Sequence, residues 1–419
     1  MPSIKSRLRA FLLTQNPGFQ KYLSACTWVY EQLFLPLRYM PGSSIVWGPP
    51  RGMYQTASEF NKRNPTTPII ELTFREPIPC MYRVPWSNSA IVTSFFTEKV
   101  NTKLIEKKAW FFKNARYFYG HNGTIITSDD KIFLPLSPPE FYRTYKNQQS
   151  FYHLKLPKMA RLKKVILIDT LKAGVNNYYH WLCDHIARFF WLRRLGIDLS
   201  EYTLVATNGS ADFCRQTREV LIIGGFNFKE WLFTHDFPHF YADEIIVPPF
   251  VNFQLMYGFL DIDEINFLRG FWLKKGKPDI DVNDKIYLSR RKAGRRSTPA
   301  HLELTDRLTQ HGVKEVFLED MTIFEQATTL NNAKLIIGIH GAAFTNLVFC
   351  KAGTTVIEIF GADLMFASYW SISETLNLNY YAYCDDEYKS SSPPQDDYLA
   401  PIYINVDNFF NCFTKLNLL

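Results

Sequence analysis

Short apolar runs alternate with helix signals along residues 285–360, and this alternation constrains the fold more than any other feature of the sequence. Thr298 followed by Pro299 predicts the start of one helix, and the capping-box pair Thr322 and Glu325 predicts the start of another. Strands that alternate with helices build a parallel sheet, so this half is predicted to be a Rossmann-like unit of four or five strands. The predicted strands are 286–288, 315–318, 335–339 and 356–360.

The same order is present earlier in the chain. An apolar run at 164–168 predicts a strand, and a helix is expected over 178–195, ended by Gly196. A strand at 203–206, a helix at 212–223 and a strand at 244–247 follow. Residues 66–158 favour short strands instead, with hairpin turns at Asn122-Gly123 and at Asp129-Asp130.

These patterns predict an α/β protein with two Rossmann-like lobes and a β-containing N-terminal extension. The C-terminal tail is expected to contain a helix that crosses back to the first lobe. The predicted segments are the extension 1–160, a first lobe 161–255, a second lobe 256–390 and the tail 391–419.

Composition narrows the class of protein. With 47% hydrophobic and 16% aromatic residues among 419, the chain is neither disordered, nor collagen-like, nor a coiled coil. The net charge of +7 favours an anionic ligand or surface and is too small to imply nucleic acid by itself. The seven Cys are scattered without a C-x-x-C motif, which argues against a disulfide framework or structural zinc and favours a reduced, cytoplasmic protein.

No run of 18 apolar residues predicts a membrane span. The N-terminus is basic, and the aromatic stretch 22–37 is interrupted by Glu31. Two interpretations stay open for this stretch, a core helix or a helix lying on the inner face of a membrane.

The most informative segment is 335–346, where an apolar strand leads into Gly-Ile-His-Gly-Ala-Ala and a short helix. Small residues at Gly338, Gly341 and Ala342 let a ligand approach the backbone, and a helix N-terminus favours an anion such as phosphate. His340, at the end of the strand, can donate a hydrogen bond to the same anion. The plainer interpretation is a tight turn between a strand and a helix.

A cluster of basic residues follows the strand 286–288 and therefore lies at the same predicted sheet edge. Arginine binds phosphate oxygens with two parallel hydrogen bonds, so we favour Arg290, Arg295 or Arg296 as diphosphate ligands. The alternatives are a solvated basic loop and a nucleic-acid patch. The cluster consists of Lys285, Arg290, Arg291, Lys292, Arg295 and Arg296.

Two further groups carry candidate chemistry. Glu358 lies within an apolar strand, where it either accepts hydrogen bonds from a ribose or pairs with an arginine. His180, Asp184 and Arg188 are spaced to share one helix face, so His180 and Asp184 are a candidate general-base pair or part of a structural ladder.

Two D-x-D sequences were weighed as metal sites. Asp261 and Asp263 more simply begin a helix, and Asp279 and Asp281 lie in a predicted linker. The segment 235–239 has metal-like histidines that are interrupted by Phe and Pro. No metal and no cofactor are expected.

Taken together, these blocks resemble glycosyltransferase family 61. The block from Asn177 to Asp184 is similar to the family's Asn-x-x-His-x-x-x-Asp motif, and Ser289-Arg290 with Arg295-Arg296 is similar to its Ser-Arg and Arg-Arg motif. The segment 338–346, which ends in Asn346 and continues to Glu358, is similar to its His-Gly-Ala motif. The chain departs from the pattern at 299–300, where Pro-Ala stands in place of the family's Asn-Glu.

The resemblance implies a two-lobed GT-B-like fold and an inverting, metal-independent glycosyltransferase of the EC 2.4 class. It implies a nucleotide-sugar donor, with UDP favoured, and a glycan or lipid-linked acceptor, as in bacterial capsule, lipopolysaccharide or exopolysaccharide synthesis. The base would be Asp184 or His180, and the donor ligands would be Arg290, Arg295, Arg296, His340, Gly341, Ala342, Asn346 and Glu358. Two other classes stay open, a non-catalytic nucleotide or nucleic-acid binding protein that uses residues 285–296 and a metal-dependent enzyme that uses Asp261 and Asp263.

Overall fold

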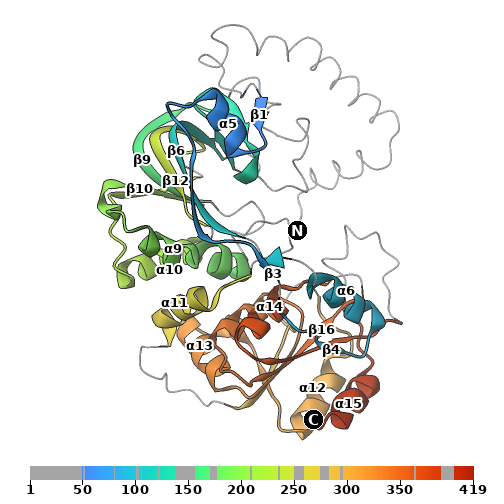
Figure 1. Cartoon of the computed structure of the whole chain (residues 1–419). Helices are drawn as coiled ribbons and strands as arrows, with labels where there is room; N and C mark the ends of the chain where they lie inside the picture. The colour runs from blue at the N-terminus through green and yellow to red at the C-terminus, as the bar shows by residue number, and fades with distance from the viewer. Residues whose placement is uncertain are drawn as a thin grey trace, which may run out of the picture. The chain divides into compact units, whose positions relative to one another are not determined.

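The structure is a computed structural model of the chain (Figure 1). It describes residues 50, 52–79, 81–100, 103–104, 106–119, 123–136, 156–169, 177–207, 210–234, 236–249, 259–273, 283–292, 296–362, 365–387 and 401–419. The contacts divide the chain into two units. Unit 1 comprises Met1–Pro68, Lys113–Leu162 and Phe237–Asp243, and unit 2 comprises Ile69–Phe112, Lys163–Asp236 and Glu244–Leu419. The units interleave along the chain, and the consecutive segments expected from the sequence stay a prediction.

Unit 2 contains a six-stranded parallel sheet with the order β14-β13-β15-β16-β17-β4. Its register sets Leu288 opposite Gly338, and Gly338 opposite Glu358. The strands predicted in the second half are confirmed, except that the strand predicted over 315–318 ends at Val316 and Leu318 begins a 3-10 turn. The strands are β4 Trp86–Ser87, β13 Lys285–Leu288, β14 Lys314–Val316, β15 Leu335–Ile339, β16 Thr355–Phe360 and β17 Asn379–Cys384.

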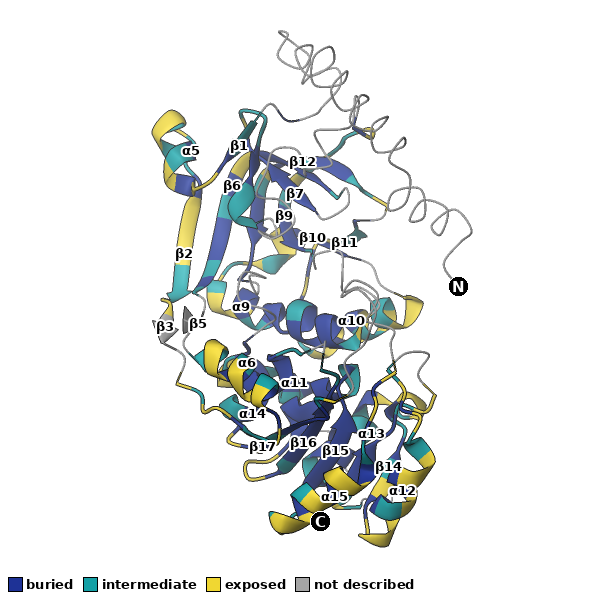
Figure 2. Cartoon of the chain, turned by 90° about the vertical axis from the view of Figure 1, so that its right-hand side faces the viewer, coloured by how far each residue is buried: buried dark blue, intermediate teal, exposed yellow. Residues whose placement is uncertain are grey.

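Helices cover both faces of this sheet, because alternate strand residues point to opposite sides. Ile286 and Ile336 belong to the core cluster with α13, η8 and α14, whereas Tyr287 and Ile337 belong to the cluster with α12 and α15. The helices α12, α13, α14 and α15 are labelled around the sheet in Figures 1 and 2. The covering helices are α12 His301–Gln310, α13 Ile323–Asn332, the 3-10 helix η8 Ala342–Phe349, α14 Ser368–Thr375 and α15 Val406–Lys415.

Two expectations for these helices need correction. The helix predicted from Thr298 begins at His301, because the Thr298 hydroxyl accepts from Ala300 N in a turn that precedes the helix. The C-terminal helix α15 packs its Phe409 and Phe413 side chains on the same sheet as Ile337, so its buried face is used there and not in the first lobe. The capping box of Thr322 and Glu325 is confirmed.

The first predicted lobe also contains parallel strands in unit 2. Thr203 of β10 is paired with Val165 of β9 on one side and with Glu230 of β11 on the other. The predicted helix 178–195 is present, but its first part is a π-helix, η4, because Ala187 N bonds to Leu182 O five residues back. The elements are β9 Ala160–Ile168, η4 His180–Ile186, α9 Arg188–Leu195, β10 Thr203–Ala206, α10 Ala211–Ile223, β11 Glu230–Phe233 and β12 His239–Val247.

Unit 1 contains both predicted hairpins, whereas the helix α6, Ala90–Val100, interrupts the predicted β-rich region in unit 2. Strand β6 pairs antiparallel with β7, and β7 pairs antiparallel with β8. Gly123 and Asp130 occupy the turns with φ of 63° and 65°, while Asn122 lies outside the described residues. Arg116 holds the second turn by an ion pair of 2.5 Å with Asp130. The elements are β1 Gly52–Tyr54, α5 Ala57–Arg63, β6 Lys107–Phe118, β7 Thr124–Ile126, β8 Lys131–Phe133 and η2 Leu134–Leu136.

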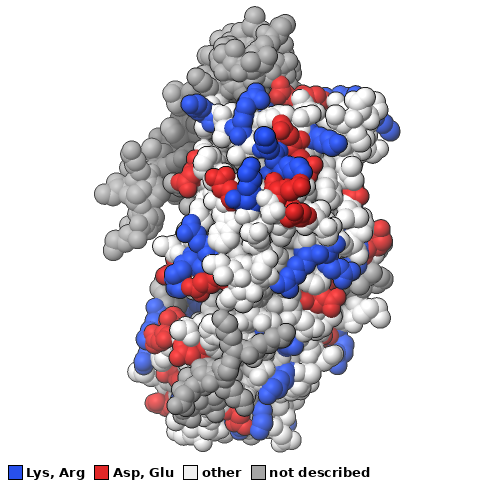
Figure 3. All heavy atoms as spheres, turned by 90° about the vertical axis from the view of Figure 1, so that its left-hand side faces the viewer, with Lys and Arg blue, Asp and Glu red and all other residues white. Residues whose placement is uncertain are grey.

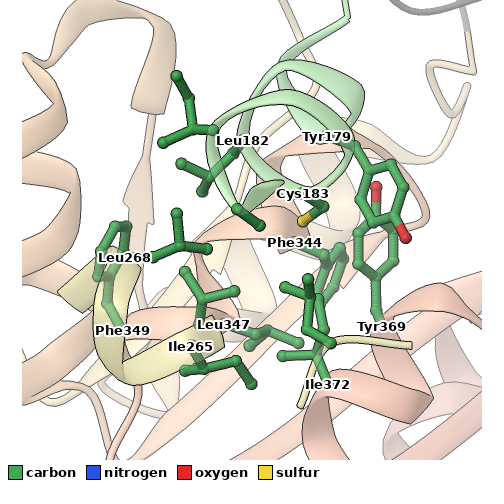
Figure 4. Close-up of a cluster of buried hydrophobic side chains, with 14 of the residues drawn as sticks. Tyr179, Leu182, Cys183, Ile265, Leu268, Phe344, Leu347, Phe349, Tyr369 and Ile372 are labelled. Carbon is green, nitrogen blue, oxygen red and sulfur yellow. The ribbon is translucent and has the colours of Figure 1, made fainter. Parts of the chain in front are cut away.

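The main hydrophobic core of unit 2 joins the two predicted lobes. One cluster contains Ile166 and Leu182 from the first half together with Ile336 and Trp370 from the second half. In Figure 4, Leu182 of η4 packs near Leu268 and Leu347. The helix that carries His180 is therefore buried against the second half. The remaining elements are β2 Ile70–Arg75, β3 Ile78–Pro79, α6 Ala90–Val100, β5 Lys103–Leu104, η5 Leu199–Glu201, α11 Ile262–Trp272 and η7 Leu318–Asp320.

Candidate functional site

The order of the six-stranded sheet reverses between β13 and β15. Strand β14 lies on one side of β13, and β15 to β17 follow on the other side. In open parallel sheets, ligands bind outside the carboxyl ends of the strands at such a reversal. Arg290 comes two residues after β13, and His340 comes directly after β15. The topology therefore brings both predicted anion-binding segments to the position where a ligand is expected.

Arg290 and Gly341 are in direct contact at this sheet edge. A Cβ atom built on residue 341 would overlap Nη1 of Arg290 and would lie 2.9 Å from its Cζ. Gly338 is also needed, since a Cβ there would come within 3.0 Å of the Phe344 ring and 3.1 Å of Leu288 Cβ. The two glycines thus let a guanidinium and a helix approach the end of β15 closely.

His340 is held rigidly at the end of its strand. Its Nδ1 lies 2.5 Å from Glu358 Oε1, and its ring is stacked between Phe360 and Phe366 at centroid distances of 5.4 and 5.2 Å. Tyr380 donates its hydroxyl to the other carboxylate oxygen, and burial together with Glu358 raises the Tyr380 pKa. This arrangement fixes the histidine ring so that Nε2 is directed away from Glu358.

Glu358 therefore has structural partners on both of its oxygens. Its side chain has no exposed surface. These partners are a histidine and a tyrosine, in place of the arginine that the sequence suggested as the alternative, and the ribose contact stays a prediction.

The remaining basic residues have separate positions. Arg296 has a left-handed backbone, with φ of 54°, and its positive charge opposes the rise that burial causes in the pKa of Tyr369. Lys292 pairs with Asp320 and lies 4.7 Å above the Phe317 ring, which Arg291 also approaches, at 5.2 Å. Arg295 lies outside the described residues.

Asn346 and Ala342 belong to η8, which follows the glycine turn. Asn346 is fully buried, accepts from the Tyr178 hydroxyl at 2.9 Å and donates to Gln326 Oε1 at 2.9 Å. The amide thus links η8 to the helix of the first motif. Ala342 is the first residue of η8 and lies next to Gly341.

The side chains of His180 and Asp184, the candidate general-base pair, are in contact on η4. His180 Nδ1 lies 2.5 Å from Asp184 Oδ2, and the two side chains are 9% and 14% exposed. The Asp184 Oδ1 atom is buried and has no hydrogen-bond partner among the described residues. Arg188, expected on the same face, donates to the main-chain carbonyls of Asp169 and Pro248 at the ends of β9 and β12.

Sequence reasoning missed the tyrosines that connect these pairs. Tyr179 contacts the His180 ring and also the ring of Tyr369, and Tyr369 contacts His340. Figure 4 shows the rings of Tyr179 and Tyr369 side by side. Tyr179 lies inside the block from Asn177 to Asp184, so the sequence could have indicated that it lies beside His180. Tyr369 and Tyr380 follow the motifs in the chain and carry no local signal.

The candidate metal ligands have other partners. Asp261 forms the capping box of α11 with Glu264 and pairs with Arg75, as expected for a helix start. Asp279, Asp281 and His235 lie outside the described residues. His239 is buried and its Nδ1 donates to the Pro157 carbonyl at 2.9 Å. Among the described residues, no three His, Cys, Asp or Glu side chains form a cluster that could hold a metal ion.

Within the described residues, no helix is long and apolar enough to cross a membrane. The stretch 22–37 lies outside them. On the face shown in Figure 3, Lys and Arg side chains are interspersed with Asp and Glu, so this face carries no extended basic surface of the kind that binds nucleic acid.

The parallel sheet, its reversal and the arginine and histidine at its edge are the arrangement of an α/β protein with a ligand site at the carboxyl ends of its strands. The family model described as Glycosyltransferase 61 matches residues 178–357, a segment that contains His180, Asp184, Arg290 and His340. Residues 178–357, less than half of the chain, thus resemble glycosyltransferase family 61, and this resemblance supports a sugar-transferring enzyme. A search of curated protein sequences found no match.

Proposed function

We propose that the chain is an inverting, GT-B-like glycosyltransferase that moves a sugar from a nucleotide-sugar donor, with UDP favoured, to a hydroxyl of a glycan or lipid-linked acceptor. The family match supports sugar transfer, and the contact between Arg290 and Gly341 at the sheet reversal supports the donor site. We place the reaction in bacterial capsule, lipopolysaccharide or exopolysaccharide synthesis, in the cytoplasm, with the N-terminus contacting the membrane surface.

The donor diphosphate is proposed to lie against Arg290, Arg296 and the turn from His340 to Ala342. Guanidinium groups and free N–H groups at the start of η8 would stabilise the charge that develops on the leaving diphosphate. These positive groups would supply the stabilisation that a divalent metal gives in other enzymes. Glu358 would act by holding the His340 ring, with Nε2 directed to the phosphate.

The acceptor hydroxyl is proposed to be deprotonated by the pair on η4. Asp184 accepts the hydrogen bond from His180 Nδ1 and orients the ring, and Nε2 of His180 is proposed to take the proton of the hydroxyl. The oxygen attacks the anomeric carbon as the bond to the diphosphate oxygen breaks, which inverts the configuration and releases the nucleoside diphosphate. Asp184 remains the alternative base through Oδ1, which has no partner within the described part of the chain.

Thermal unfolding in the presence of UDP, GDP, CMP and AMP, each with magnesium and with EDTA, tests the donor site. A ligand that binds only the native state raises the unfolding temperature. We expect UDP to give the largest shift, in EDTA as well as in magnesium, and Arg290→Ala to abolish it. A shift that requires magnesium contradicts metal independence, and no shift with any nucleotide contradicts the donor assignment.

A second experiment tests the base. Asp184→Asn and His180→Gln should each lower transfer from a UDP-sugar at least 100-fold while leaving UDP binding unchanged, since general-base catalysis contributes roughly 10²–10⁴-fold. Retained transfer in His180→Gln alone would assign the base to Asp184.

A further inference from the structure

Two tyrosine rings connect the two histidine–carboxylate pairs of the candidate site. The Tyr179 ring lies 5.3 Å from the His180 ring and 5.8 Å from the Tyr369 ring, measured between centroids. The Tyr369 ring lies 5.3 Å from the His340 ring. All four side chains are buried. A closely packed row of four rings therefore leads from the partner of Asp184 to the partner of Glu358.

Tyr369 is the member of this row that belongs to neither motif. It comes from the first turn of α14 and also contacts Phe344 of η8, at 5.6 Å. Its ring therefore touches η8, the end of β15 and the residue that precedes η4. Figure 4 shows the Tyr369 ring beside Tyr179, with Phe344 close by.

A second contact ties the same helix to the same half. The Tyr178 hydroxyl donates to the buried amide of Asn346 in η8. Tyr178 and Tyr179 thus point to two different elements of the donor-binding half, and together they fix the start of η4 in position and in rotation. The Tyr369 ring contacts the His340 ring directly and reaches the His180 ring through Tyr179.

We propose that Tyr369 is a positioning residue. Its ring sets the distance between the His180–Asp184 pair on η4 and the donor-binding turn at His340. The proposal rests on the function proposed above and adds a residue that acts through Tyr179 and His340 without touching substrate. Transfer requires the acceptor oxygen and the anomeric carbon to be held at near-attack distance, and a displacement of about 1 Å can cost roughly 100-fold in rate.

Three variants test this role. Tyr369→Leu removes the ring, Tyr369→Phe keeps the ring and removes the hydroxyl, and Tyr383→Leu is the matched control, a buried tyrosine on the opposite face of the sheet. We expect Tyr369→Leu to lower kcat at least tenfold while UDP affinity stays within threefold. Tyr369→Phe should keep kcat within threefold, and Tyr383→Leu should lower the unfolding temperature with kcat unchanged.

NMR spectroscopy of the His180 imidazole tests the same role without an activity assay. The NMR signals of the His180 imidazole should shift in Tyr369→Leu and stay in place in Tyr383→Leu. Unchanged His180 signals, an unchanged kcat in Tyr369→Leu, or equal losses of kcat and UDP affinity would each overturn the positioning role. Tyr369→Phe as inactive as Tyr369→Leu would overturn it in favour of a chemical role of the hydroxyl. A wild-type protein without transfer, but with the His180 shift, would overturn the proposed function and leave the ring contact established.

Discussion

The guanidinium of Arg290 occupies the space where a side chain on residue 341 would begin, so the arginine position depends on the glycine. The two residues follow adjacent parallel strands, β13 and β15, and lie 51 positions apart in the chain. This contact makes the glycine of the His-Gly-Ala turn a determinant of where the positive charge is held.

Gly341→Ala is therefore expected to weaken UDP binding at least tenfold, because the new methyl group displaces Arg290, and a hydrogen bond to a charged group contributes about 1.5–3 kcal/mol. Calorimetric titration with UDP measures the effect. Gly270→Ala is the matched control, since nothing lies within 4 Å of a Cβ at that helical position. The control should bind UDP normally; normal binding in Gly341→Ala would show that Arg290 does not contact the donor.

Because the carboxylate of Glu358 is buried, removing one of its hydrogen-bond donors should lower the free energy of unfolding. Tyr380→Phe takes away one hydrogen bond to a charged, fully buried group and should lower the free energy of unfolding by about 1.5–3 kcal/mol in urea. Tyr381→Phe, in the same strand on the opposite face, should change it by less than about 0.5 kcal/mol. Equal effects of the two substitutions would contradict the role given to the Glu358 interaction.

The ion pair of Lys107 and Glu264 is deeply buried, with side chains that are 5% and 3% exposed. Lys107 Nζ lies 2.9 Å from Glu264 Oε2, and the Trp191 indole donates to Oε1 at 2.6 Å. Lys107→Met should lower the free energy of unfolding by about 3–5 kcal/mol, because it leaves a buried charge without its partner. Lys164→Met removes an exposed pair with Glu201 and should lower the free energy of unfolding far less in the same urea experiment.

The burial of His185 predicts that the protein loses stability in acid. Burial, and to a smaller extent the charge of Arg188, lowers the His185 pKa from 6.5 to about 3. Between pH 6.5 and pH 3, His185 is protonated in the unfolded chain and neutral in the folded chain. The free energy of unfolding therefore falls as the pH drops through this range, by up to about 1.4 kcal/mol per pH unit. His185→Gln should flatten the pH dependence of urea unfolding between pH 6.5 and 5. An unchanged slope in this variant would show that His185 does not carry the effect.

The sequence alone determined the elements that local chemistry controls. Apolar runs of the length of a strand predicted β10, β13 and β15. The capping box predicted the start of α13, and the turn residues predicted both hairpins of unit 1. The spacing of four residues between His180 and Asp184 predicted their contact, because helix geometry fixes which side chains share a face. Each of these signals acts within a few residues of chain.

Only the tertiary structure decided which distant side chains meet. The partner of Glu358 turned out to be His340 with Tyr380, Asn346 bonds to Tyr178, and Tyr369 lies between two motifs that are 160 residues apart. No local pattern encodes such contacts, because they depend on the order of strands in the sheet and on which face each helix covers. The same reason explains why Glu358 could be predicted to need a partner and the partner could not be named from the sequence.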